Sequence, residues 1–267
     1  MGMISTLYTN PKCKAERFRS SLDNKLYYVY NVSTGFSNYS QLKSDYSYEY
    51  NEYKTTKYSL CNVHMIAMGL IYTGIYTKYA NEINAKYPEL PRLPDKLAKY
   101  LIEDSEIRKY YEKRFPTQSK EFTDGKKDAY GPNEIHNVLS YGTNKFIDAG
   151  TVTYFSSNVS WKEIMYELVY KNNPVGISGK FSGLNHIVLL VGCAYSKLDN
   201  GTCPGDNQVP DYLIIDDPFG KTYEYGKGLS GNDVWIPFSR CLDDFKALDN
   251  LSFKYAHRFI RPNELGF

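Results

Sequence analysis

Residues 60–72 form the segment that most limits how this chain can fold. Drawn as a helix, they are apolar nearly all round, in the order Leu-Cys-Asn-Val-His-Met-Ile-Ala-Met-Gly-Leu-Ile-Tyr. Such a helix has no face that suits water, so it has to lie inside a domain with other elements around it. The sequence therefore predicts one buried central helix that the rest of the chain must cover.

Two later segments carry helix start signals at a proline. Pro94 opens a stretch with apolar residues on one side and charges opposite. Pro132, at a first-turn position, opens a short helix over 133–140, which Gly142 can close.

A change from helices to strands follows. Ser160 and Glu163 form a capping box for a helix over 161–171, and Pro174 follows its end. Apolar runs come next and predict strands over 175–178, 186–191, 212–216 and 253–260. Because helices come first and strands later, the order favours an α+β fold with an antiparallel sheet over alternating βαβ units.

The first 48 residues differ from the rest in composition. They are polar and rich in tyrosine, of which the chain has 27, and a strand is expected over 26–32. We interpret 1–48 as an N-terminal extension and 49–267 as one domain, a size that suits a single large core. The tyrosines either fill half-buried strand positions or form an aromatic surface that stacks on sugars or extended polymers.

The charge balance and hydropathy argue against several partner classes. The 32 basic and 30 acidic side chains give a net charge of +2, which favours neither nucleic acid nor an anionic membrane. No apolar run reaches about 18 residues, so no transmembrane segment is expected. Residues 1–10 lack a basic stretch followed by an apolar core, so we expect no secretory signal and cytoplasmic synthesis.

The five cysteines leave at least one thiol unpaired within the chain. Cys193 and Cys203 flank a turn-rich loop and are candidates for a disulfide. Cys61 and His64 have metal-ligand spacing, and a zinc site completed by Cys193 and Cys203 is an alternative. No second tightly spaced pair supports that alternative, so we expect no metal and no cofactor.

Cys61 stands at the front of the buried helix. The positive end of a helix dipole lowers the pKa of a thiol there and favours the thiolate, which is the nucleophilic form. The alternative, a cysteine that acts as a small hydrophobic residue, is more common. A nearby base would decide between these two alternatives. His136 and His257 have no group of catalytic residue types around them in the sequence.

His186 begins one predicted strand, and Asp217 follows the end of another. If these strands form an antiparallel hairpin, the register that pairs Val191 with Tyr212 also pairs His186 with Asp217. A carboxylate that holds an imidazole in this way prepares it to act as a general base. The alternative is a strand-end histidine and a turn aspartate that are both merely solvated.

Asp216 competes with Asp217 for the histidine. Adjacent strand residues point to opposite faces, so only one of the two carboxylates can face His186. Pro218 forces an extended conformation on Asp217 and fixes its direction. We therefore favour Asp217 as the residue that orients the ring.

Three blocks of sequence stand in a fixed order within roughly residues 50–225. The first is 61–68, which begins with Cys61; the second is 174–178 followed by 185–192; the third, 215–220, reads Ile-Asp-Asp-Pro-Phe-Gly. Together they resemble the papain-like cysteine peptidases related to those that remove double-glycine leader peptides from bacteriocins.

This resemblance implies a papain-like α+β fold, in which an N-terminal nucleophile helix packs on an antiparallel sheet. It also implies that Cys61 attacks a carbonyl carbon, that His186 moves the proton from the thiol to the leaving amine, and that Asp217 holds the ring.

The sequence departs from the family pattern around the nucleophile. The family has an upstream glutamine as an oxyanion donor, whereas here the nearest, Gln41, lies 20 residues before Cys61. Asn51 is closer, and we expect its amide and the backbone N–H of Cys61 to be the two donors. His64 and Asn185 also stand where the family has Ser or Thr and Gly.

The expected function is a cysteine peptidase acting on peptide chains. One version acts on bacterial cell-wall peptides in the manner of a phage lysin, released from the cell and helped to dock by the tyrosine-rich extension. The sequence leaves the scissile bond and the oligomeric state open. The alternative is an inactive papain-like scaffold that serves as a binding or structural module. The departures around Cys61 favour the scaffold, and the order of nucleophile, base and orienting residue favours the enzyme.

Overall fold

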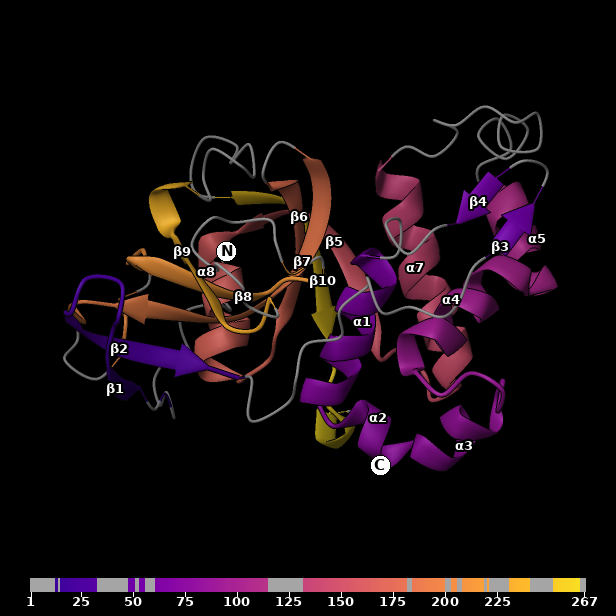
Figure 1. Ribbon diagram of the computed structural model, residues 1–267, viewed down its shortest axis with the longest axis horizontal. Coiled ribbons are helices and arrows are strands. Elements are labelled where there is room, and N and C mark those ends of the chain that lie inside the picture. The colour runs from indigo at the N-terminus through magenta and orange to yellow at the C-terminus, as the bar shows by residue number, and fades with distance from the viewer. Residues whose placement is uncertain are drawn as a thin grey trace, which may run out of the picture.

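The fold combines helices with an antiparallel sheet, so the expected α+β class is confirmed. The computed structural model describes residues 13, 15–32, 48–50, 53–55, 61–114, 132–181, 184–199, 203–205, 208–218, 220, 231–240 and 252–264. Most of the helices gather beside one another on one side of the sheet (Figure 1). None of the helices described is both long and apolar enough to cross a membrane.

One sheet contains eight of the described strands. Its order is β1, β2, β7, β6, β10 and β5, with β8 beside β7 and β9 beside β8, and these pairings are antiparallel. Its members are β1 (Glu16–Arg19), β2 (Leu26–Asn31), β5 (Thr153–Ser160), β6 (Val175–Phe181), β7 (Leu184–Tyr195), β8 (Tyr212–Asp216), β9 (Val234–Pro237) and β10 (Ser252–Phe259). Strands β3 (Tyr48–Tyr50) and β4 (Tyr53–Thr55) pair in a separate hairpin.

Strand β7 organises the sheet because it has three partners. It pairs with β6 along 184–190, with β8 along 189–194 and with β2 along 192–195. Its apolar side chains alternate between two cores, so that Leu189 belongs to one and Leu190 to the other. Both faces of this strand are therefore buried.

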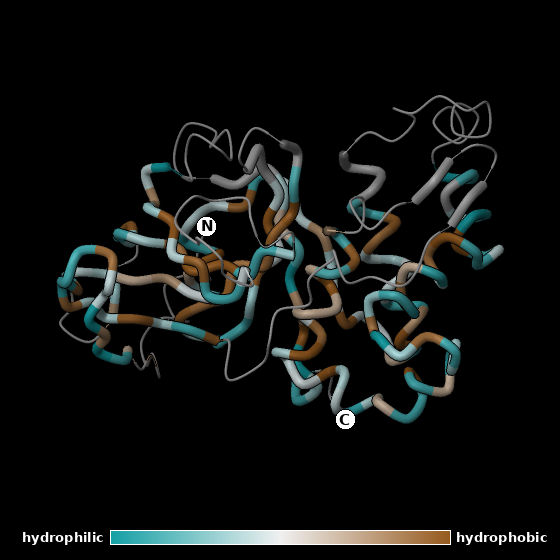
Figure 2. The backbone as a smooth tube through the Cα atoms, viewed as in Figure 1, coloured by the Kyte–Doolittle hydropathy of each residue, from teal (hydrophilic) through white to brown (hydrophobic). Residues whose placement is uncertain are grey.

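Helices cover the two faces unequally. Helices α1, α4 and α7 share one core with the sheet, whereas α8 and the π-helical turn η3 contribute to the other. The described helices are α1 (Cys61–Tyr72), α2 (Ile75–Lys78), α3 (Ala80–Ala85), α4 (Leu93–Glu103), α5 (Ser105–Arg114), α7 (Pro132–Ile147) and α8 (Trp161–Met165), with η3 (Tyr166–Tyr170) and the 3-10 turn η5 (Pro262–Glu264). Along the backbone, hydrophobic segments lie mainly in the interior and hydrophilic ones mainly at the periphery (Figure 2).

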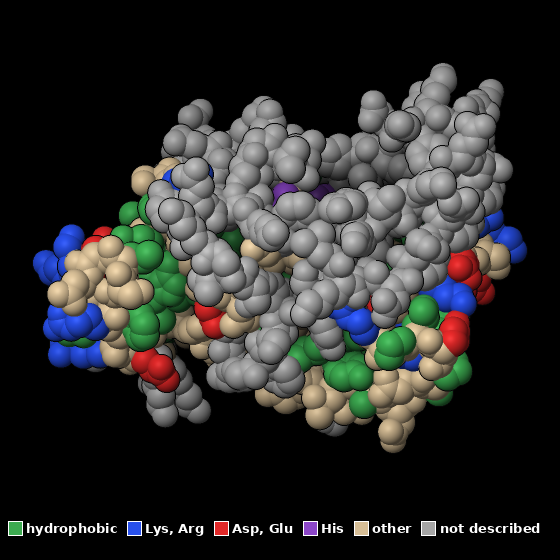
Figure 3. Space-filling model, in the orientation of Figure 1, with side chains coloured by type: hydrophobic (Ala, Val, Ile, Leu, Met, Phe, Trp, Pro, Cys, Tyr) green, Lys and Arg blue, Asp and Glu red, His purple; other side chains and the backbone are tan. Residues whose placement is uncertain are grey.

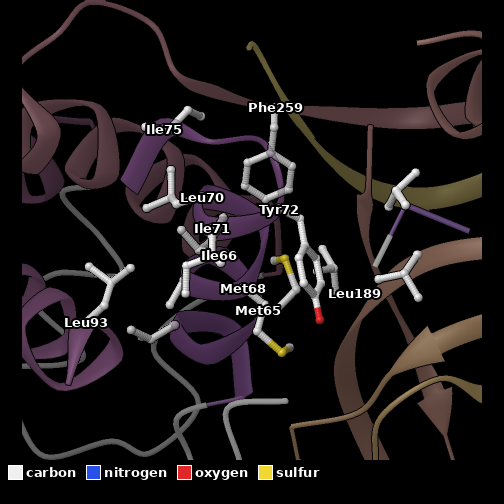
Figure 4. Packing of buried hydrophobic residues seen from close by; sticks show 14 of the residues in the cluster. Met65, Ile66, Met68, Leu70, Ile71, Tyr72, Ile75, Leu93, Leu189 and Phe259 are labelled. Atoms are coloured by element: carbon white, nitrogen blue, oxygen red, sulfur yellow. The ribbon is translucent and has the colours of Figure 1, made fainter. Parts of the chain in front are cut away.

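Helix α1 is the buried central helix that the sequence predicts. Every residue from Val63 to Tyr72 is buried, and the apolar ones pack among helices on one side and strands on the other (Figure 4). Gly69 allows the close approach of β10, since a Cβ atom at this position would lie 2.0 Å from Cζ of Phe259. The nucleophile candidate is thus at the front of a helix that is buried along nearly all of its length.

Helix α7 corrects the expected helix over 133–140. It begins at Pro132, as predicted, but continues to Ile147 and passes through Gly142. A Cβ atom at Gly142 would lie 2.1 Å from Cδ2 of Leu101 on α4. The glycine is therefore needed for a close helix–helix contact, and the prediction that it ends the helix is wrong.

The capping box at α8 is confirmed. The Ser160 hydroxyl accepts from the backbone N–H of Glu163, and the Glu163 carboxylate accepts from the backbone N–H of Ser160. The helical chain then continues as η3 and ends before Pro174, as the sequence indicated.

Strands β1 and β2 join the described part of the N-terminal segment to the main sheet. Strand β2, which was expected over 26–32, pairs with β7. A disulfide also links Cys13 to Cys203 across a sequence separation of 190. Cys203 is therefore not bonded to Cys193, the candidate partner that the sequence offered, and Cys193 is a buried free thiol on β7.

Candidate active site

Cys61 is the first residue of α1. Its side chain is half-buried and forms no disulfide, while the helix residues from Val63 onwards are buried. The thiol therefore lies at the positive end of a helix dipole, where a negative charge on sulfur is stabilised. This is the placement that the sequence predicted for a nucleophile.

His186 and Asp217 meet in a shielded hydrogen bond. The distance from His186 Nε2 to Asp217 Oδ1 is 2.7 Å, and the two side chains are 7 % and 2 % exposed. A contact this short between a carboxylate and a ring N–H is strengthened by charge when the ring is protonated. Figure 3 shows histidine side chains at the floor of a hollow on the face in view.

The register that was expected to bring this pair together is wrong. Leu189 lies opposite Asp216, and a bulge interrupts the pairing of β7 with β8 between Leu190 and Gly192. If this register continues past Asp216, Asp217 lies opposite the residue that is two positions after His186 on β7. Diagonal neighbours two residues apart remain within reach of long side chains, and an even offset keeps both on one face. The contact therefore forms although the residues are not directly opposite.

Backbone hydrogen bonds fix the turn that carries Asp217. Its N–H donates to the carbonyl of Gly231 at 2.7 Å, and its own carbonyl accepts from the N–H of Gly220 at 3.1 Å. Gly220 has a φ of 72°, a left-handed conformation that favours glycine. The Asp-Pro-Phe-Gly sequence thus has a local reason to hold the carboxylate in one direction.

His186 is electrostatically coupled to both neighbours. Burial lowers the pKa of the imidazole, but hydrogen bonds to Asp217 and to the Cys61 thiol outweigh it and raise the pKa to about 9. Because Nε2 is engaged by Asp217, Nδ1 is the ring nitrogen left for the thiol. Below that pH the ring is an imidazolium beside the sulfur of Cys61, so a proton donor and a candidate nucleophile lie together.

Asp216 has a different environment from its neighbour. Its carboxylate accepts from the Tyr72 hydroxyl at 2.5 Å and from the backbone N–H of Asp233 at 2.8 Å. Burial raises the pKa of Asp216 to about 7, although the hydrogen bonds from Tyr72 and Asp233 act against it. The prediction that only Asp217 faces the histidine agrees with these contacts.

The expected oxyanion donor Asn51 lies outside the described residues. The backbone N–H of Cys61, at the start of α1, is the donor that the described chain can supply. His64 is fully buried within the same helix. The zinc alternative fails because Cys203 is bonded to Cys13, and no group of three or more potential ligands occurs among the described residues.

No family model, curated protein or solved structure matches this chain. Its functional assignment therefore rests on the geometry of Cys61, His186 and Asp217, together with the physical chemistry of those groups.

The sequence did not predict a pair of buried histidines. His136 on α7 and His257 on β10 have ring nitrogens 2.6 Å apart, Nδ1 to Nε2, so the expectation of no constellation is wrong. Ser140 Oγ lies 3.2 Å from Nδ1 of His257, and Ser178 Oγ lies 3.5 Å from Nε2 of His136. No local pattern signals the pair, because its members are 121 residues apart and meet only in the folded structure.

This pair predicts a loss of stability in mild acid. Burial lowers the pKa of His136 to about 4, and burial together with the neighbouring ring lowers the pKa of His257 well below its usual value. An unfolded histidine titrates near 6.5, so below that pH the unfolded chain binds more protons and the free energy of unfolding falls. For His136 the fall between pH 7 and pH 5 is about 2 kcal/mol. Urea unfolding of wild type and His136→Asn at both pH values measures it.

The difference between wild type and His136→Asn reports the contribution of His136 to the pH dependence of stability. Asp216, whose raised pKa gives stability that is lost as pH rises towards about 7, contributes equally to both proteins. Between pH 7 and pH 5, the change in the free energy of unfolding is expected to be about 2 kcal/mol less favourable in wild type than in His136→Asn. Equal changes in the two proteins would contradict the assignment.

Proposed function

We propose that this protein is a papain-like cysteine peptidase, with Cys61 as nucleophile, His186 as acid and base, and Asp217 as the residue that orients the imidazole. The observation that carries the proposal is the linkage of all three groups through one ring. His186 bonds to Asp217 at 2.7 Å and interacts with the Cys61 thiol. Two further observations support the proposal: Cys61 is the first residue of α1, and the side chains of His186 and Asp217 are buried.

The proposed reaction has two stages that share the same groups. The Cys61 thiolate attacks the carbonyl carbon of a peptide bond, and the backbone N–H of Cys61, with Asn51 as the proposed second donor, stabilises the oxyanion. The His186 imidazolium gives its proton to the leaving amine, which leaves a thioester on Cys61. His186 then takes a proton from water, whose oxygen attacks the thioester; the acid product leaves, and the thiolate and imidazolium are restored.

The proposed substrate is a peptide chain, with bacterial cell-wall peptides as the specific case. The Cys13–Cys203 disulfide supports action outside a reducing compartment, since such bonds persist in oxidising surroundings. It ties the N-terminal segment to the loop between β7 and β8, in the domain that carries His186. The lysin version of the proposal has this extracellular setting.

Thiol labelling tests the proposal without a known substrate. Iodoacetamide at neutral pH is expected to modify Cys61 rapidly, and His186→Ala is expected to slow this modification at least about tenfold because the thiolate loses its counter-ion. Cys193 serves as an internal reference, since burial raises the pKa of its thiol to about 12. Mass spectrometry of tryptic peptides assigns the modified residue.

The same experiment distinguishes the enzyme from an inactive scaffold. Labelling by the anionic probe iodoacetate should decline relative to iodoacetamide as the pH passes about 9, where His186 loses its proton. Slow labelling of wild-type Cys61, unchanged in His186→Ala, would favour a scaffold and redirect the search to binding partners.

A further inference from the structure

Helix α1 is joined to the sheet by a polar contact at the end opposite Cys61. Tyr72, the last residue of α1, donates its hydroxyl proton to Oδ2 of Asp216 at 2.5 Å. Asp216 is the last residue of β8 and directly precedes Asp217. One helix thus carries the candidate nucleophile at its front and, at its back, a bond to the strand that delivers the orienting carboxylate.

Both aspartates are also tied to the same backbone segment, Asp216 through its carboxylate and Asp217 through its backbone N–H. Oδ1 of Asp216 accepts from the N–H of Asp233 at 2.8 Å, and the N–H of Asp217 donates to Gly231 at 2.7 Å. The Asp233 side chain in turn accepts from the amide of Asn31 on β2 at 2.9 Å. The end of β8 is therefore held from two sides, and Tyr72 is its link to α1.

This contact differs in kind from the packing around it. Asp216 is fully buried beside Leu189, its strand partner, and Figure 4 shows the Tyr72 oxygen pointing away from the helix towards this strand. Apolar packing holds α1 through shape, as the close approach of Gly69 to Phe259 shows, but it is not directional. A short hydrogen bond depends on distance and angle and therefore adds a directional constraint on the position of the helix.

We propose that Tyr72 and Asp216 are positioning residues that set the spacing between Cys61 and the His186–Asp217 pair. The inference rests on the proposed function, because it gives the contact a purpose in the reaction. A displacement of about 1 Å at reacting groups costs up to 10²-fold in rate, so a hydrogen bond that fixes this spacing has a measurable effect.

The charged groups around Asp216 give the link a dependence on pH. Asp217 and Asp233 are the neighbouring carboxylates, and both disfavour ionisation of Asp216. Ionised Asp216 accepts a stronger bond from Tyr72 than its protonated form does. The link is therefore expected to tighten as pH rises through about 7.

Four variants test the inference with iodoacetamide labelling of Cys61. Tyr72→Phe and Asp216→Ala, which remove the bond, are expected to slow labelling about tenfold. Asp216→Asn keeps an acceptor for the tyrosine and should retain most of the wild-type rate. Tyr195→Phe, which removes a buried hydroxyl in the other core, is the matched control and should label at the wild-type rate. Circular dichroism and thermal unfolding report whether each variant folds.

The dependence of labelling on pH separates positioning from mere stability. Wild type and Tyr195→Phe should show a step in rate near pH 7, and Asp216→Asn should lack it. Rapid, His186-dependent labelling of wild type with unchanged labelling in Tyr72→Phe and Asp216→Ala overturns the positioning role alone. Slow labelling of Cys61 in wild type overturns the proposed function and the positioning role with it. Equal slowing in Tyr195→Phe shows a general effect on stability and also overturns the role.

Discussion

Replacement of Cys61 by alanine is expected to reduce peptide-bond hydrolysis by on the order of 10⁴-fold or more and to leave the fold intact. The acyl-enzyme forms on the sulfur of Cys61, and alanine offers no atom in its place. The helix should persist because alanine has the highest helix propensity and the replaced side chain is only half-buried. Turnover of peptide and wall-peptide substrates, with circular dichroism of the same samples, measures both parts.

Two further variants sharpen the assignment of the nucleophile. Cys61→Ser should also be inactive, because an alcohol is a far weaker acid than a thiol and the imidazole does not ionise it. Cys193→Ala removes a buried thiol on β7 and should lose some stability but no activity. Activity retained in Cys61→Ala would end the nucleophile assignment.

The central helix could be predicted because its sequence allows few alternatives. Residues 60–72 have no polar face, so only a buried position is available to them. The capping box at Ser160 and the start of α7 at Pro132 were predictable for a similar reason, since each signal acts within one helical turn. The order of helices and strands then gave the fold class.

Features that depend on distant contacts could not be predicted. The bulge between Leu190 and Gly192 shifts the register of β7 with β8, and no local signal marks it. Gly142 resembles a helix stop unless the position of Leu101 on the neighbouring helix is known. The disulfide of Cys13 and the pairing of His136 with His257 likewise join segments that are distant in the chain.

The contact between His186 and Asp217 was predicted for a partly wrong reason, and this shows what the sequence constrains. The true register differs from the expected one by an even number of residues at this end of the strands, so both side chains stay on the same face. An odd shift would have turned Asp216 towards the histidine. Whether the shift was even or odd, more than its size, decided which carboxylate meets the ring.

Replacement of Asp217 by asparagine is expected to lower the rate about 10²-fold to 10³-fold, whereas Asp216→Asn should have a much smaller effect. Asparagine can accept a hydrogen bond from Nε2 of His186, but it lacks the charge that stabilises the imidazolium. The alkaline limit of activity, set by a pKa of about 9 for His186, should therefore move to lower pH in Asp217→Asn only. Rates measured from pH 5 to pH 10 on one peptide substrate test both statements.

The comparison of adjacent carboxylates tests the role of each, because the two substitutions are chemically identical and one residue apart. Asp216 contacts Tyr72 and Asp233, so its replacement removes a charge that the imidazole does not contact. A larger loss in Asp216→Asn than in Asp217→Asn would contradict the orienting role of Asp217.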